Sequence, residues 1–199
     1  MARTKDQALH DQRHRAILLA AARVFKAKGF HLARTEDICA EAGLSAGTLF
    51  RHFPDKWSMI VAIAEIEFER YEAELGRLAT REGIAWLANL SAGDLDELLR
   101  PRGFDLGVDS WLEISRDPEG RKRLHAVDRR LRRTLATELK RGQTEGWVKP
   151  TLDCDGTASV VLALFSGLLF DAEVGISIDT QATAAAIRSL FGAYLQPPG

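Results

Sequence analysis

The chain has little of what a covalent or metal-bound scaffold needs, because only two of its 199 residues are cysteines. Cys39 and Cys154 have neither the spacing of a zinc site nor the number for a disulfide framework. Proline is also scarce, with six residues, and no run of alternating polar and apolar residues suggests a β-strand. These absences exclude a disulfide-rich scaffold and favour a helical protein in a reducing compartment.

Long hydrophobic runs and catalytic patterns are missing as well. The longest apolar stretch, residues 159–170, is shorter than the roughly 20 residues that a membrane-spanning helix needs. Arg3 and Lys5 precede polar residues rather than an apolar run, so no signal peptide is expected. None of the five histidines has a catalytic spacing to a serine or cysteine, and no cluster resembles a metal site. The sequence predicts a cytoplasmic protein with no cofactor, metal or membrane partner, and it disfavours an enzyme.

What the sequence does contain is an uneven distribution of charge. Residues 1–60 hold ten Lys/Arg against six Asp/Glu, a balance of +4, whereas residues 61–199 hold 17 against 22, a balance of −5. A basic end joined to an acidic remainder is typical of a nucleic-acid-binding segment attached to a part that does not touch phosphate. Seven Lys/Arg gather within residues 121–133, where we favour a solvated helix face over a second nucleic-acid site.

The most informative stretch is residues 35–56, TEDICAEAGLSAGTLFRHFPDK. It predicts two short helices, over 36–42 and 46–52, separated by a glycine that can adopt the left-handed conformation of a helix stop. Thr35 and Ser45 are suitable N-caps for these helices. Two such helices around a tight turn form a helix-turn-helix, whose second helix enters the DNA major groove.

Helical periodicity continues through the rest of the chain. Helices are expected over 12–28, 56–78, 84–91, 94–100, 104–115, 118–143, 153–174 and 180–195. The helix that begins after Asp55 is too long to serve the helix-turn-helix alone. Its first half is therefore expected to close the N-terminal core, and its second half to continue into the remainder.

The block GLSAGTLFRHFPDK, preceded by an amphipathic helix and followed by a long helical remainder, resembles the TetR family of transcriptional regulators. The likeness is weaker through WLEISRDPEGRKRL and EGWVKPTLDCDGTASVVLALFSGLLF, which are similar to the ligand-binding halves of choline-responsive repressors. The resemblance implies an all-α homodimer. It also implies a three-helix DNA-binding domain over residues 1–58 and a helical bundle over 59–199 that holds a ligand pocket and the dimerisation helices.

The resemblance also implies the residues that contact double-stranded DNA. The expected set is Thr35, Ser45, Ala46, Gly47, Thr48, Phe50, Arg51, His52 and Lys56. Arg51 is the expected base reader, because a guanidinium can bind guanine O6 and N7 together. Phosphate contacts are expected from Thr35, Ser45, His52 and Lys56. Phe50 stands where the family usually carries a phosphate-binding tyrosine, and a core role is favoured for it.

Three alternatives stay open for these basic residues. Arg51 could be a solvated helix residue, and His52 could serve packing alone. An N-terminal arm could reach the minor groove or remain a solvated tail; its basic members are Arg3, Lys5, Arg13 and Arg15.

The C-terminal part offers one candidate ligand pocket. Within residues 104–115, acidic side chains at positions 105, 109 and 113 fall on one side of the expected helix, close to Trp111. Aromatic rings beside a carboxylate suit a cationic or amine-bearing ligand. The candidate pocket residues are Trp86, Phe104, Asp109, Trp111 and Phe165. A solvated acidic stripe with the aromatic residues in the core is the favoured alternative.

The last two helices are expected to form the dimer interface. The helix over 153–174 is apolar nearly all round, which indicates burial on more than one side. Two such helices from each subunit would make a four-helix interface. The expected interface residues are Val161, Leu164, Phe165, Leu168, Ile187, Phe191 and Tyr194. Alternatively, both helices bury only against their own domain.

The sequence therefore predicts a ligand-responsive transcriptional regulator, with repression favoured, that binds a palindromic operator as a homodimer. A small-molecule effector would release the protein by favouring a different spacing of the two recognition helices. The first alternative is an architectural or partner-controlled DNA-binding protein without an effector. The second is an enzyme that retains a helix-turn-helix, which no nucleophile or cofactor motif supports.

Overall fold

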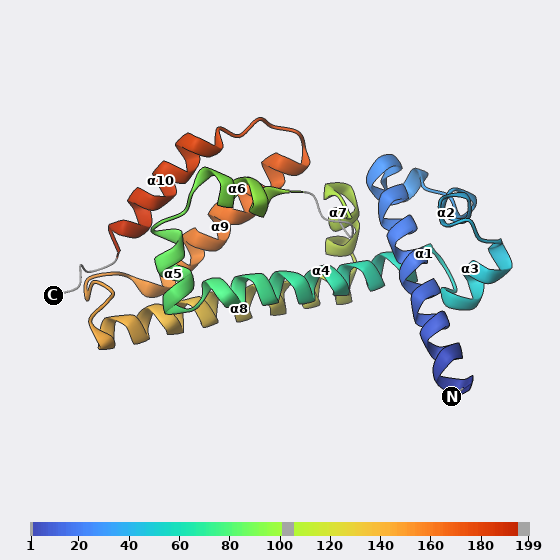
Figure 1. Cartoon of the computed structure of the whole chain (residues 1–199), viewed down its shortest axis with the longest axis horizontal. Helices are drawn as coiled ribbons and strands as arrows, with labels where there is room; N and C mark the ends of the chain where they lie inside the picture. Colours follow the sequence, from blue (N-terminus) through green and yellow to red (C-terminus); the bar gives the residue numbers. More distant parts are fainter. Residues whose placement is uncertain (1, 101–105, 195–199) are drawn as a thin grey trace. The chain divides into compact units, whose positions relative to one another are not determined.

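The computed structural model describes residues 2–100 and 106–194, and these form ten helices (Figure 1). This confirms the all-α prediction. The helices are α1 (Ala2–Leu32), α2 (Thr35–Ala42), α3 (Ala46–His52), α4 (Lys56–Leu78), α5 (Arg81–Leu87), α6 (Ala92–Leu99), α7 (Val108–Arg116), α8 (Pro118–Glu145), α9 (Cys154–Glu173) and α10 (Thr180–Gly192).

Contacts between residues group the chain into two compact units. Unit 1 consists of Met1–Glu69 and Pro101–Leu124, and unit 2 of Arg70–Arg100 and His125–Gly199. Unit 1 contains the helix-turn-helix, and unit 2 contains α5, α6, α9 and α10. The division into functional domains at residue 58 remains a prediction.

The first helix is longer than the sequence predicted. α1 begins at Ala2 rather than at residue 12, because its first residues carry little apolar periodicity and so give no helical signal. Gly29, the expected stop, has a φ of 76° and interrupts the helical backbone, which then continues to Leu32. Arg13 and Arg15 therefore lie on a helix rather than on an unstructured arm.

The two helices of the motif agree with the prediction to within one residue. The turn between them uses Gly43, whose φ of 65° is left-handed. Ser45 caps α3 as expected, since its Oγ accepts a hydrogen bond from the backbone N–H of Thr48 at 3.3 Å. Leu49 is the buried residue of α3, so one side chain anchors this short helix to the core.

Thr35 is not the N-cap that the sequence suggested. Arg34 occupies that place, and its backbone N–H donates to Asp37 Oδ2 at 3.1 Å. An acidic residue in the first turn replaces the expected threonine hydroxyl and also suits the positive end of the helix dipole. Lys28 Nζ lies 2.8 Å from Asp37 Oδ1, and its hydrogen bond is the main cause that lowers the pKa of the Asp37 carboxyl.

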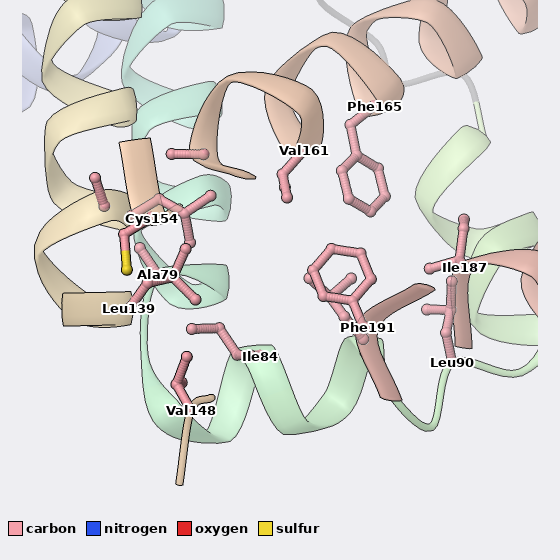
Figure 2. Close-up of a cluster of buried hydrophobic side chains, with 14 of the residues drawn as sticks. Ala79, Ile84, Leu90, Leu139, Val148, Cys154, Val161, Phe165, Ile187 and Phe191 are labelled. Carbon is pink, nitrogen blue, oxygen red and sulfur yellow. The ribbon is translucent and has the colours of Figure 1, made fainter. Parts of the chain in front are cut away.

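The core of unit 2 lies between α5, α8, α9 and α10, where Phe165 and Phe191 point toward each other near Ile187 and Leu90 (Figure 2). Most of the residues predicted for the dimer interface belong to this core. Those that are buried here are Val161, Phe165, Leu168, Ile187 and Phe191. Leu164 and Tyr194 are partly buried against the same cluster.

These burials correct the predicted interface. Five of the seven predicted interface residues are buried within their own unit, as the alternative interpretation held. An exposed apolar stripe remains on α9. Its members are Val160, Ala163, Gly167 and Phe170, with Val174 at the helix end.

Among the described residues, α9 is also the helix that is long and apolar enough to cross a membrane, judged by length and composition alone. It has 20 residues, whereas the apolar run seen in the sequence was shorter, and 33% of its most apolar window is buried. Core helices of water-soluble proteins meet the same criterion, so this is weak evidence for a membrane span.

Candidate nucleic-acid interface

The exposed face of α3 combines small, aromatic and basic side chains. Ala46, Gly47, Phe50 and Arg51 are all exposed, while Leu49 on the opposite side is fully buried. The core role favoured for Phe50 is wrong, because 49% of this residue is accessible. A single buried anchor thus leaves the rest of the helix free to meet a partner.

Gly47 is notable because nothing inside the protein requires a glycine there. No heavy atom of the described chain lies within 4 Å of the position that a Cβ would occupy, and its φ is not left-handed. A glycine inside a helix costs about 0.5–1 kcal/mol relative to alanine. Glycine is usually found at such a position where another backbone or a ligand comes close. At Gly47 that neighbour would have to come from outside the molecule.

Polar side chains at the exposed face are linked in a short chain. Arg51 Nη2 donates to Thr48 Oγ1 at 3.1 Å, and the hydroxyls of Thr48 and Ser45 are 3.1 Å apart. Thr35 is half-buried at the start of α2, where its hydroxyl donates to Glu36 Oε2 at 3.4 Å. The guanidinium of Arg51 is therefore held along α3 rather than extended into solvent.

His52 lies against the N-terminal half of α1. Its ring centroid is 4.5 Å from that of His10 and 5.9 Å from that of His14. Burial is the main cause that lowers the pKa of His52, and the nearby positive charges add to it. Packing, the alternative role, accounts for this position, and phosphate binding by His52 remains a prediction.

Lys56 is engaged inside unit 1. Its Nζ donates to the carbonyl oxygens of Phe30 at 2.5 Å and Ala33 at 2.9 Å, and it lies 4.4 Å from the centroid of the Phe30 ring. A lysine at the C-terminal end of a helix satisfies carbonyls that lack helical partners and suits the negative end of the dipole. Desolvation lowers the pKa of this amine. Lys56 thus has a structural role that the sequence did not reveal.

The acidic residues of α7 contact the end of α1. Asp109 Oδ2 accepts a hydrogen bond from the backbone N–H of Phe30 at 3.0 Å, and Glu113 Oε1 lies 3.1 Å from His31 Nε2. The hydrogen bond from His31 is the main cause that lowers the pKa of Glu113. Both carboxylates thus bind the end of the first helix; Asp109 remains exposed, as the acidic-stripe alternative held, and its role in a ligand pocket remains a prediction.

The other predicted pocket residues are dispersed. Trp111 packs edge-on against Phe68 in unit 1, with ring centroids 5.1 Å apart. Trp86 and Phe165 belong to the hydrophobic cluster of unit 2. Phe104, like Asp105, lies outside the described residues. Neither unit by itself brings the whole predicted set together.

The sequence did not single out Glu67, which is 6% exposed. Its Oε1 accepts a hydrogen bond from the backbone N–H of Leu106 at 2.8 Å. The neighbouring residue Phe68 lies against Trp111 and, at 5.7 Å, against the guanidinium of Arg123. A buried glutamate in an otherwise apolar helix stripe is the signal that could have identified it.

Within the described part of the chain, no group of three or more His, Cys, Asp or Glu is arranged to hold a metal ion.

Comparison with known proteins connects both parts of the chain to one kind of regulator. The family model for bacterial regulatory proteins of the tetR family matches residues 17–63, and the model for the C-terminal part of BetI-type transcriptional repressors matches residues 76–196. The HTH-type transcriptional regulator UidR of Escherichia coli is 28% identical over 182 residues, which cover 90% of this chain and 91% of the relative.

Two solved structures have the same fold. GusR of Salmonella enterica superposes with a TM-score of 0.65 at 23% identity, covering 92% of this chain and 94% of its own. A protein from Saccharomonospora viridis, solved in complex with choline, superposes with a TM-score of 0.69 at 23% identity, covering 94% of this chain and 100% of its own.

Proposed function

The chain belongs to the TetR family of transcriptional regulators, and from this premise we propose that it is a repressor. It binds a palindromic operator as a homodimer in the cytoplasm and is released by a small-molecule effector. The match of residues 76–196 to the C-terminal part of BetI-type repressors favours repression over activation. Since the family consists of regulators, the enzyme alternative is set aside.

The exposed face of α3 is the observation that carries this proposal. Gly47 weakens the helix without serving any contact inside the protein, and Arg51 is already aligned beside it through Thr48. A helix that enters the major groove needs small side chains where it approaches the bases and a bidentate donor where it reads them. α3 provides both on the same exposed face.

Selection of bound fragments from random double-stranded DNA tests the function directly. The purified protein is expected to enrich a sequence with two inverted half-sites about one helical turn apart. The selected duplex should bind at least a hundredfold more tightly than a scrambled duplex of equal length. Equal affinity for both duplexes over a range of salt concentrations would remove sequence-specific regulation.

The exposed stripe of α9 supports the homodimer. Val160, Ala163, Gly167 and Phe170 follow the three- and four-residue spacing of a helix–helix seam. Val160 and Phe170 are 53% and 49% exposed, so their apolar surface lacks a cover within unit 2. Pairing with the same stripe of a second subunit would bury it around a twofold axis.

A cationic effector is favoured by the cluster at α4 and α7. Glu67 is a buried carboxylate; Phe68 follows it in the chain, and the ring of Phe68 contacts that of Trp111. A carboxylate with aromatic faces attracts quaternary ammonium groups, and the similar protein from Saccharomonospora viridis was solved with choline. Arg123, which lies over Phe68, would have to yield its place to such a ligand.

Titration with choline and related amines, followed by tryptophan fluorescence, tests this effector class. Binding should quench or shift the emission and should lower the affinity for the selected duplex. Glu67→Gln should weaken amine binding at least tenfold, whereas Glu69→Gln on the same helix should not. If no amine alters either signal, the effector-free regulator becomes the better hypothesis.

A further inference from the structure

The N-terminal half of α1 meets the C-terminal end of α3 in a cluster of histidines and arginines. His10 and His14 lie one helical turn apart on α1, and His52 is the last residue of α3. The ring centroids of His10 and His14 are 6.3 Å apart, and both rings lie within 6 Å of His52. The sequence did not suggest this cluster, because the first helix was expected to begin after His10.

An open hollow of about 460 Å³ lies at this cluster. Its lining consists of Leu9, His10, Arg13, Arg51 and His52. Two guanidinium groups and two imidazoles thus line one concave surface beside the exposed face of α3. A lining of this kind is suited to an anion.

The groups that face the cluster from each element are mostly cationic. α1 contributes Arg13 besides the two histidines, and its Asp11 lies beside His10, with Oδ1 3.6 Å from Nδ1. α3 contributes Arg51, and after it Phe53 stacks on His14 with centroids 4.4 Å apart. Burial and, after it, these positive groups lower the pKa of His52 in the free protein.

The buried nitrogen of His52 points to a missing partner. His52 Nδ1 is shielded from solvent and has no hydrogen-bond partner among the described residues. An unsatisfied buried polar atom costs about 1–3 kcal/mol. A partner that is absent from the free protein, or a proton that arrives with that partner, would relieve this cost.

We infer that His10, His52 and Arg13, with the adjacent His14, form a phosphate site that takes one backbone phosphate of the bound DNA and takes up protons as it does so, while Arg51, which also lines the hollow, reads the bases. The inference rests on the proposed DNA-binding function. A phosphate placed in the hollow replaces repulsion between cationic groups by attraction to each of them. Protonated imidazoles then donate hydrogen bonds to its oxygens, as charge-assisted pairs.

The sign of the pH effect follows from this coupling. The imidazoles are more protonated in the complex than in the free protein, so DNA binding takes up protons and becomes tighter as the pH falls. A rise of one unit in the pKa of one histidine on binding gives a gain in affinity of up to about tenfold on going from high to low pH, and several-fold over a two-unit range that spans the titration. Two coupled histidines would give more.

The test measures the affinity for the selected duplex at pH 6, 7 and 8 and constant ionic strength. The wild type is expected to gain several-fold in affinity from pH 8 to pH 6. The double variant His10→Gln/His14→Gln should lose most of this gain. His125→Gln, a change of an exposed histidine on α8, is the matched control and should keep it. A double variant with the full pH dependence of the wild type would overturn the inference.

A second measurement separates this inference from the proposed function. Inorganic sulfate, a tetrahedral anion whose charge is constant over this pH range, is added while the histidine ring protons are followed by NMR. Sulfate should raise the pKa of the cluster histidines but not that of His125. If sulfate acts in this way while no duplex binds, the site takes a free anion and the assignment to the DNA backbone is wrong. If DNA binds and the cluster responds to neither anion nor pH, its role is packing and the inference fails.

Discussion

Individual residues show that a basic side chain in the right place is not necessarily a phosphate ligand. Lys56 follows the recognition helix, where the family pattern suggested a DNA contact, yet its amine is hydrogen-bonded to carbonyls at the end of α1. Arg51, by contrast, bonds to a neighbouring hydroxyl on the same helix and stays exposed. The two residues are therefore expected to respond differently to substitution.

Replacing Lys56 by methionine should lower stability rather than sequence selectivity. The variant leaves half-buried carbonyls of α1 without their donor, and we expect a loss of about 1–3 kcal/mol in the free energy of unfolding. Urea denaturation measures this loss. Lys122→Met is the control, since Lys122 belongs to an exposed ion pair whose removal should cost less than about 1 kcal/mol. A drop of about one in the salt slope of DNA binding, with unchanged stability, would restore the phosphate role of Lys56.

Replacing Arg51 by alanine should remove sequence selectivity. Loss of a bidentate contact to guanine is expected to weaken binding to the selected duplex by about 1–3 kcal/mol, and to weaken binding to a scrambled duplex much less. Fluorescence anisotropy with both duplexes measures the ratio. Thr48→Val, which replaces the hydroxyl that holds Arg51 in the free protein by a methyl group, should have a smaller effect. An equal loss on both duplexes would indicate a phosphate contact instead.

Among the helices, α1 and α7 meet at a glycine whose backbone conformation and surroundings both disfavour a side chain. Gly29 has a φ of 76°, and a Cβ built there would lie 2.7 Å from Asp109 Oδ2. Gly43 has a similar φ of 65°, but no described heavy atom lies within 4 Å of its Cβ position. The two glycines therefore differ both in ψ, which is 158° at Gly29 and 35° at Gly43, and in the space at the Cβ position.

Gly29→Ala should consequently be more destabilising than Gly43→Ala. Gly43→Ala carries the strain of a left-handed conformation, about 1–2 kcal/mol. Gly29, with a ψ of 158°, lies in a region that is essentially limited to glycine, and its variant must also displace the carboxylate that binds the N–H of Phe30. We expect an additional loss of about 1 kcal/mol for Gly29→Ala, measured by thermal unfolding. Equal losses would show that neither the ψ of Gly29 nor the displacement of Asp109 adds a cost.

The sequence predicted the helices well where caps and apolar spacing agree. Ser45 and Asp117 cap their helices as expected, with hydrogen bonds to the backbone N–H groups of Thr48 and Gly120. It failed at the start of α1, which has too few apolar residues to produce a periodic signal. The sequence also could not show which face of α9 packs against its own unit. A helix that is apolar on all sides has no distinct buried face.

Only part of the candidate site could be predicted from the sequence, because some of its contacts are local and others are long-range. The position of α3 follows from local capping and turn residues, which a sequence displays directly. The partners of Lys56 and His52 are set by contacts with α1, 20 or more residues away in the chain. Such long-range contacts have no counterpart in local patterns, so the roles of these two residues needed the structure.

For the whole molecule, the exposed stripe of α9 leads to a prediction about assembly. A Cβ at Gly167 would meet no described heavy atom within 4 Å, so Gly167→Leu fits the single subunit and should even stabilise the helix, by about 0.5–1 kcal/mol. At a close helix–helix seam, the added side chain would hold two subunits apart. Light scattering should show a dimer for the wild type and a monomer for Gly167→Leu.

Gly76→Leu provides the control for this experiment. Gly76 lies on α4 and also has open space at its Cβ position, so the same substitution there should leave the dimer intact. A Gly167→Leu protein that remains dimeric would show that the interface lies on another face.

If the stripe is the dimer interface, as proposed, it also affects a newly made subunit that is still unpaired. Val160 and Phe170 then face water, and exposed patches of this kind promote unwanted association. An unpaired subunit is thus expected to be short-lived. A second subunit, whose stripe has the same spacing of side chains, is best suited to bury this surface. At a low cellular concentration, such a regulator would meet its operator rarely. A larger fraction of its subunits would also remain unpaired and open to proteolysis.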